Sequence, residues 1–96
     1  MTIREKILTN AFHAVTVDRN AAHGKPEDTF RHIAAQWSAY LGHPLAPHDV
    51  ACMMALMKIA RIKGNPTHED SWTDLAGYAA CGAEAALGRG DPEPAG

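Results

Sequence analysis

The sequence predicts an all-α domain of four helices. Apolar residues recur at intervals of three and four along most of the chain, no stretch alternates apolar and polar residues as a strand would, and Gly or Pro residues separate the periodic stretches. The 96 residues correspond to one domain, and a hydrophobic content of 46% is enough to build a core. A domain of this size buries only about 60–65% of its unfolded surface. We therefore expect homodimerisation to complete or extend the four-helix domain.

The first two helices are predicted over residues 2–17 and from residue 26 to residue 41. Thr2 and Glu5 have the spacing of a capping box, and apolar residues then recur at helical spacing. Pro26 suits the first turn of the second helix, and Gly42 is expected to end it. The apolar stripe of this helix is expected to contain Phe30, Ile33, Ala34, Trp37 and Leu41.

The third helix is predicted over residues 47–63 and the fourth over residues 68–87. Apolar residues surround so much of the third helix that we expect most of its surface to be buried. Thr67 and Asp70 fit a second capping box at the start of the fourth helix. Residues 1–87 thus form a single helical domain, and the Gly- and Pro-rich residues 88–96 are expected to be a disordered tail.

Small side chains dominate the second half of the fourth helix. They are Ala76, Gly77, Ala79, Ala80, Gly82 and Ala83. Because Gly inside a helix costs up to about 1 kcal/mol relative to Ala, two of them indicate that another helix approaches closely. Two interpretations remain open, packing within the chain and a dimer seam.

The composition argues against several classes of protein. A net charge of −2 without a long basic run gives no support for DNA binding. The N-terminus has no signal-peptide pattern, and no apolar run approaches the ~20 residues that span a bilayer. Cys52 and Cys81 lack a redox or zinc spacing and are expected to be buried in a reducing compartment. We expect a cytoplasmic protein that does not associate with membranes.

A pair of carboxylates opens the fourth helix. Asp70 and Asp74 are four residues apart, so both lie on one helix face. They suit Mg²⁺, which often takes one or two protein carboxylates together with substrate phosphates. The alternative is that Asp70 belongs to a helix cap and Asp74 is a solvated surface residue.

Basic residues lie near these carboxylates in the predicted fold. Lys58 and Arg61 are three residues apart near the end of the third helix, and a short turn brings them close to the start of the fourth. With Arg19 from the first loop, they form a candidate phosphate clamp. Salt bridges to the aspartates are the alternative that spacing alone favours.

Two further side chains are candidates for ligand contacts. His68 precedes Asp70, and Trp72 lies between the aspartates, where an indole could stack on a base. An exposed helix-start histidine and a core tryptophan are the alternatives. The six histidines show no zinc-binding spacing, and no serine or cysteine has the context of a catalytic triad.

The chain resembles a family of small bacteriophage and prophage proteins that is filed as a domain of unknown function. The similarity covers residues 7–87. In the first loop it rests on Asp18, Arg19, Gly24 and Pro26, with His23 where relatives have tyrosine. Later in the chain it rests on Lys58, Arg61, His68, Asp70, Asp74, Gly77 and Tyr78.

The same pattern is distantly similar to the MazG-like all-α nucleotide pyrophosphohydrolases. That similarity implies an oligomeric, Mg²⁺-dependent protein that cleaves nucleoside triphosphates, although the first ExxE ligand pair of that group is not evident here. It implies phosphate contacts from Arg19, Lys58 and Arg61, and base contacts from His23 or Trp72. The leading hypothesis is a phage nucleotide-binding protein. The alternatives are a non-enzymatic phage protein that binds a host defence protein or sequesters a nucleotide signal, and a dimerisation domain.

Overall fold

The structure is a computed structural model that describes residues 1–18 and 25–88. These residues form four α-helices and no strand. The helices are α1 (Ile3–His13), α3 (Pro26–Leu41), α4 (Pro47–Gly64) and α5 (Glu69–Leu87), and a π-helical turn, η1 (Ala14–Asp18), continues α1. The predicted all-α class is confirmed. Apart from Gly88, the predicted tail lies outside the described residues.

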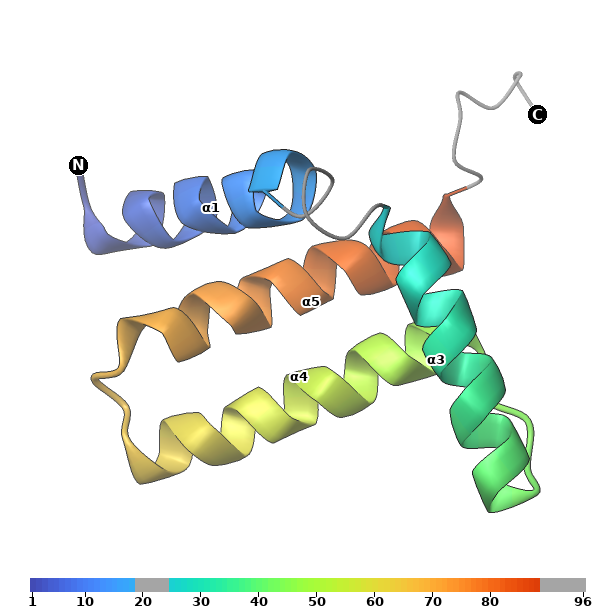
Figure 1. Ribbon diagram of the computed structural model, residues 1–96. Helices are drawn as coiled ribbons and strands as arrows, with labels where there is room; N and C mark the ends of the chain where they lie inside the picture. Colours follow the sequence, from blue (N-terminus) through green and yellow to red (C-terminus); the bar gives the residue numbers. More distant parts are fainter. Residues whose placement is uncertain (19–24, 89–96) are drawn as a thin grey trace.

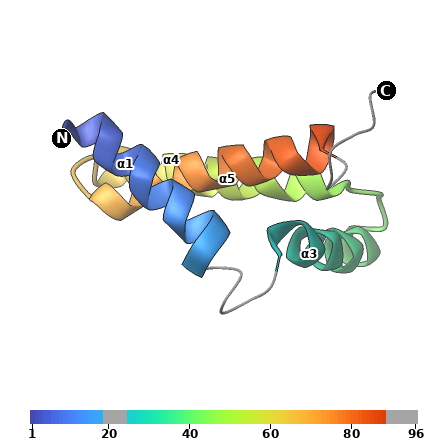
Figure 2. The same ribbon diagram turned by 90° about the horizontal axis from the view of Figure 1, so that it is seen from above.

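The helices form an antiparallel hairpin with two helices packed on it. Figure 1 shows α4 and α5 side by side, with α1 along the other edge of α5 and α3 crossing one end of the hairpin. In the view from above (Figure 2), α3 lies on one side of the hairpin and the end of α1 approaches the same side. We call this the front side. The opposite side of α4 has no helix of the described chain packed against it.

The first helix begins at the predicted cap but ends differently from the prediction. The Thr2 hydroxyl accepts a hydrogen bond from the Glu5 N–H, and the Glu5 carboxylate accepts one from the Thr2 N–H, which completes the capping box. Helical backbone extends to residue 18, but its last turn is a π-helix rather than an α-helix. In this turn the Thr16 hydroxyl donates to the Phe12 carbonyl at 2.6 Å, which satisfies a carbonyl near the wider turn.

The second predicted helix, α3, has the expected ends. Pro26 occupies its first turn, and Gly42 caps it in the left-handed conformation with φ of 69°. Its apolar stripe forms much of the core, because Phe30 and Ala34 are buried and Trp37 packs against them. The prediction for Leu41 is wrong, since this last residue of the helix is 56% exposed.

The hairpin is tight because its facing residues are small. A Cβ atom on Gly82 would lie 3.0 Å from the Cβ of Ala51 on α4, and one on Gly77 would lie 3.2 Å from Val15 Cγ1 in η1. Both distances are shorter than normal side-chain packing allows, so glycine permits these approaches. The glycines of α5 therefore serve packing within the chain, which is the first of the two interpretations.

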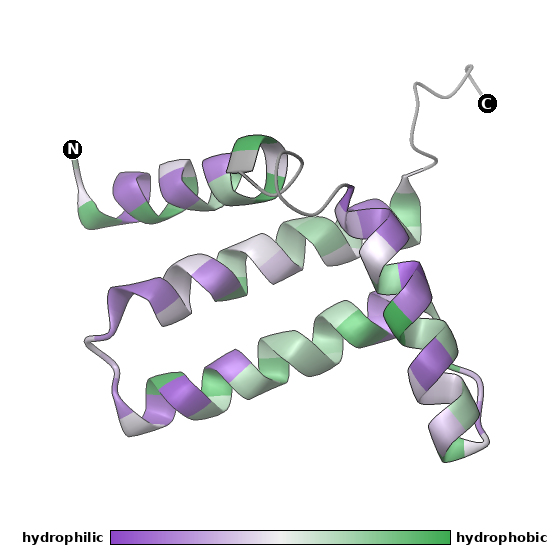
Figure 3. Cartoon of the chain, viewed as in Figure 1, coloured by the Kyte–Doolittle hydropathy of each residue, from purple (hydrophilic) through white to green (hydrophobic). Residues whose placement is uncertain are grey.

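The core is small, and the prediction that α4 is buried on most of its surface is wrong. The buried cluster consists of Phe30, Ala34, Val50, Ala51 and Cys81. On α4 itself only Val50 and Ala51 are buried, whereas Leu56 is 64% and Ile59 is 49% exposed. Figure 3 shows that much of α4 is coloured as hydrophobic. Hydropathy alone could not show which of these residues are exposed, because that depends on how much of the apolar arc the neighbouring helices cover.

Two further predictions need correction. Cys52 is exposed, although Cys81 is buried as expected. The second capping box does not form, because α5 begins at Glu69 with His68 as its N-cap, and the Thr67 hydroxyl donates instead to the Asn65 side chain at 3.1 Å. Asp70 is thus the second residue of the helix rather than the third. No helix in the described part of the chain is long and apolar enough to cross a membrane.

Candidate functional site

The predicted carboxylates and two of the predicted cations gather on the front side of the hairpin. Asp70 and Asp74 lie one turn apart on α5, and Lys58 and Arg61 lie one turn apart on α4. Lys58 Nζ is 2.8 Å from Asp74 Oδ2, so the two pairs meet across the hairpin. We call these four residues the charged patch. The structure confirms the salt-bridge interpretation for Lys58 and Asp74.

The Lys58 side chain is the most enclosed member of the charged patch. It is only 12% exposed, whereas the Asp74 side chain is 44% exposed. An enclosed ammonium group needs an anion or another acceptor close by, and Asp74 supplies one. Because Asp74 stays open to water, the ion pair is partly screened and remains accessible from outside. The arrangement holds one positive charge at a fixed place beside solvent.

Arg61 and Asp70 extend the charged patch toward the turn between the helices. Both are exposed, and neither makes an ion pair within residues 1–18 and 25–88. Asp70 also lies in the first turn of α5, where a carboxylate is stabilised by the helix dipole. The charged patch therefore has an inner ion pair and an outer arginine and aspartate that are available to a ligand.

A small cavity opens beside Asp74. Its volume is about 130 Å³, and it lies between η1, α3 and α5. The described residues that line it are Ala14, Val15, Phe30, Thr73, Asp74, Gly77, Tyr78 and Cys81. The Phe30 and Tyr78 rings form part of the wall, with centroids 6.4 Å apart and a tilt of 42°. Asp74 thus belongs both to the charged patch and to the rim of an aromatic cavity.

The cavity also contains a polar group that the sequence reasoning missed. Thr73 is only 9% exposed, and its hydroxyl makes no hydrogen bond to any described residue. A buried hydroxyl normally has a partner, because leaving it unpaired costs about 1–3 kcal/mol. One feature of the sequence indicates this burial: Thr73 lies on the same face of α5 as the small residues Gly77 and Ala80.

Trp72 does not share a side of α5 with the aspartates. It follows Asp70 by two residues, which places it roughly 200° around the helix. Its indole N–H donates to the Pro66 carbonyl at 2.9 Å, and its ring borders a groove with Ile3 and Ile7 of α1. The structure therefore gives Trp72 a role in joining α5 to α1 and to the preceding turn, and separates it from the charged patch.

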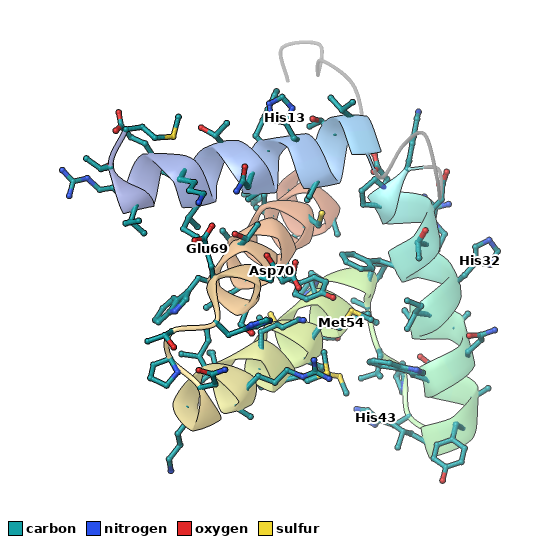
Figure 4. The ribbon with its side chains drawn as sticks, turned by 60° about the vertical axis from the view of Figure 1, so that its left-hand side comes forward. His13, His32, His43, Met54, Glu69 and Asp70 are labelled. Carbon is teal, nitrogen blue, oxygen red and sulfur yellow. The ribbon has the colours of Figure 1, made fainter. Side chains whose placement is uncertain are left out.

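The other predicted contact residues contribute less to this geometry. His68 is an exposed N-cap residue without a side-chain capping hydrogen bond. Figure 4 shows His13 and His32 pointing away from the other helices, while Asp70 lies near the space between α5 and α3. Within the described residues, no three His, Cys, Asp or Glu side chains are grouped as metal ligands. Arg19, His23 and the Asp18 side chain lie outside the described residues.

Comparison with known proteins shows the family to which the chain is similar. Residues 6–86 match the family described as "Domain of unknown function (DUF6378)". The chain is 47% identical over 77 residues to the "Gene 55 protein" of Mycobacterium phage D29, a match that covers 80% of this chain and 51% of that protein. It is 42% identical over 74 residues to the "Gene 55 protein" of Mycobacterium phage L5, covering 76% of this chain and 47% of that protein. No solved structure matches.

These matches identify the family of the chain but give no information on its similarity to MazG-like pyrophosphohydrolases. The matched segment is most of the chain, so the chain belongs to the DUF6378 family. The expected resemblance to uncharacterised phage proteins is confirmed. The similarity to MazG-like pyrophosphohydrolases is not shown by any of the comparisons. The chain spans about half the length of the phage relatives that it matches.

Proposed function

We propose that this member of the DUF6378 family binds the phosphate groups of a nucleotide, with Mg²⁺, at the charged patch. The observation that carries the proposal is the placement of Lys58, whose side chain is 12% exposed and whose Nζ lies 2.8 Å from Asp74 Oδ2, while Asp74 in turn lines an aromatic cavity. A fixed ammonium beside solvent is a suitable point charge for a phosphate. The exposed Arg61 guanidinium, one turn further along α4, supplies a second contact that can be bidentate.

The two carboxylates suit a metal that arrives with the phosphates. Mg²⁺ keeps several waters and typically takes one or two protein carboxylates plus phosphate oxygens. Asp74 uses Oδ2 for Lys58, and within the described residues nothing pairs with Oδ1 or with Asp70. The pair therefore offers two oxygen donors of the right type. When bound, the metal would neutralise phosphate charge. If the Asp74 side chain turned toward the metal, the bound phosphate would take its place as the partner of Lys58.

Thermal unfolding against nucleoside triphosphates, with and without Mg²⁺, tests this proposal. A ligand at 100 times its Kd adds about 2.7 kcal/mol, which raises the Tm of a domain this size by about 10 °C or more. Arg61→Met should remove most of that increase, whereas Lys63→Met on the same helix should keep it. A Mg²⁺-dependent increase that is equal in both variants would contradict phosphate binding at the charged patch.

Product analysis of each bound nucleotide separates two versions of this function. Release of monophosphate and pyrophosphate that stops in Asp70→Asn, in a protein that still folds, would support a pyrophosphohydrolase. Recovery of the nucleotide intact would support sequestration of a nucleotide signal. Both outcomes are compatible with the charged patch as the binding site.

A second candidate function is association through the exposed side of α4. Leu56 and Ile59 lie three residues apart on the side opposite Val50, and they are 64% and 49% exposed. Contiguous apolar surface of this kind is typical of protein interfaces. We propose that a second copy of the chain covers it, which would complete the four-helix domain. A host protein bound at the same surface is the alternative.

Sedimentation velocity tests this second candidate. If two copies associate here, Leu56→Lys should convert a dimer to a monomer. Leu8→Lys on α1 is the matched control, because Leu8 has the same 64% exposure as Leu56. A wild-type protein that is monomeric at all concentrations would reject the homodimer and direct attention to a host partner.

A further inference from the structure

The cavity beside Asp74 has the features of a subsite for a ring. We infer that it takes the base of a pyrimidine nucleotide, with the Thr73 hydroxyl as its polar contact. This inference rests on the proposed function, because the phosphates of the same nucleotide would lie on the charged patch. It goes further by naming the class of base and the residues that select it.

The first argument is continuity between the cavity and the charged patch. Asp74 lines the cavity, and its Oδ2 is 2.8 Å from Lys58 Nζ. A ligand with a ring in the cavity would therefore lie next to Asp74, with Lys58 as the adjacent cation. Nucleotides combine a flat ring with phosphates in this way, so one molecule can occupy both places.

The second argument is the chemistry of the wall. The partly buried Tyr78 supplies aromatic surface, and its ring centroid lies 6.4 Å from that of Phe30, a core residue that is 3% exposed. Stacking on aromatic side chains is a general mode of base binding, because every base has a π-face. Val15 and Gly77 add apolar surface, and the polar part of the lining comes from Thr73 and Asp74. A flat ring with polar edges fits these surroundings better than a charged group does.

The third argument is the unpaired hydroxyl inside the cavity. Thr73 is 9% exposed and has no hydrogen-bond partner among residues 1–18 and 25–88. A hydroxyl can donate to a ring carbonyl or accept from an exocyclic amine, and pyrimidines carry both kinds of group at their edges. Pairing with this hydroxyl would distinguish a ligand that reaches it from one that does not.

The fourth argument is size. The cavity has about 130 Å³, and a dry protein cavity of about 150 Å³ holds a single benzene molecule. A single six-membered ring is therefore close to this cavity in size. The two fused rings of a purine would extend beyond it toward solvent, so a pyrimidine fits the enclosed part better.

Isothermal titration calorimetry in the presence of Mg²⁺ tests the inference with three probes: UTP, ATP and inorganic triphosphate. We expect UTP to bind about tenfold more tightly than ATP or inorganic triphosphate. Thr73→Val keeps the shape and removes the hydroxyl, so it should lower UTP affinity about tenfold and leave the affinity for inorganic triphosphate unchanged. Thr9→Val, at an exposed position of α1, should change neither.

Stability provides an independent readout for the same variant. Removing an unpaired buried hydroxyl should raise the Tm of the ligand-free protein by a few degrees, so Thr73→Val would be more stable and bind UTP less tightly. A structural role for the hydroxyl predicts the opposite, with lower Tm and unchanged affinity. A second variant, Ala14→Leu, should fill the cavity and reduce UTP binding without affecting inorganic triphosphate.

The outcomes separate this inference from the proposed function. Equal affinities for all three probes would keep phosphate binding and overturn the base subsite. Tighter binding of ATP than of UTP would overturn the choice of a pyrimidine. Failure of inorganic triphosphate and both nucleotides to bind would overturn the proposed function and this inference together.

Discussion

The contact between Gly82 and Ala51 makes a quantitative prediction about the hairpin. In an ordinary helix, Gly→Ala stabilises by about 1 kcal/mol because alanine has less backbone entropy to lose. At Gly82 the new Cβ would lie 3.0 Å from the Ala51 Cβ, so α4 and α5 must separate by several tenths of an ångström. Overpacking of this kind costs about 1–3 kcal/mol. We therefore expect Gly82→Ala to destabilise the protein by up to about 2 kcal/mol.

A second substitution, Ala51→Gly, separates the energetic effect of the close contact between α4 and α5 from the effect of helix propensity. Ala51→Gly alone should cost about 1 kcal/mol, because α4 gains a glycine and a buried methyl is lost. In the double variant the methyl groups have exchanged sides, so the close contact is relieved. The double-mutant cycle should show a favourable coupling of about 1–2 kcal/mol.

Urea denaturation at fixed pH measures each free energy of unfolding, and circular dichroism checks that all variants remain helical. Gly64→Ala is the control, because nothing lies within 4 Å of the new Cβ and only propensity acts. If Gly82→Ala were stabilised as much as Gly64→Ala and the cycle showed no coupling, the close packing of α4 on α5 would be refuted.

Three further predictions follow from local geometry. Gly42→Ala should lower the free energy of unfolding, measured by urea denaturation, by about 1–2 kcal/mol, because a residue with a Cβ is strained in the left-handed conformation that Gly42 adopts at φ of 69°. A decrease of less than a few tenths of a kcal/mol would contradict this cap. Hydrogen bonds from the Thr2 backbone and hydroxyl lower the pKa of Glu5 below its ordinary value of 4.5. The cap should therefore contribute fully above pH 4.5 and be lost as pH falls through the lowered pKa, so Tm profiles of wild type and Glu5→Gln should converge at low pH. Lys6→Ala breaks the exposed 3.2 Å ion pair with Glu69, and its urea midpoint should shift by the equivalent of less than about 1 kcal/mol, less still in high salt.

Much of the fold could be predicted from the sequence because the start and stop signals are local. Thr2 with Glu5, Pro26, Gly42 and Pro47 mark helix ends through capping and backbone geometry, and the structure places the ends at these residues or beside them. The exception is the start of α5. There the Thr67 hydroxyl pairs with Asn65, a contact across the turn that competes with the capping box.

What could not be predicted depends on how helices lie relative to each other. The exposure of Leu56 and the burial of Thr73 both follow from the number of helices that reach each face of the hairpin. A salt bridge between the cations of α4 and the aspartates of α5 was one of two interpretations that the sequence left open, because the short turn between the helices brings these side chains together, and the structure forms it between Lys58 and Asp74. Trp72 lies away from the aspartates because residues two positions apart in a helix point to nearly opposite sides. Its place between Asp70 and Asp74 in the sequence therefore does not bring it close to them.

The order of the helices along the chain has a consequence for synthesis. The helix that α1 packs on, α5, is translated after the other three helices, and its first residue follows the end of α1 by roughly 55 residues. At 5–20 residues per second this delay is several seconds, far longer than a helix needs to form. During that time the apolar sides of α1 and α3 have no α5 to cover them. The helix that is translated after the other three therefore closes the core, and a nascent chain that stops before residue 69 would expose its apolar surface to chaperones and proteases.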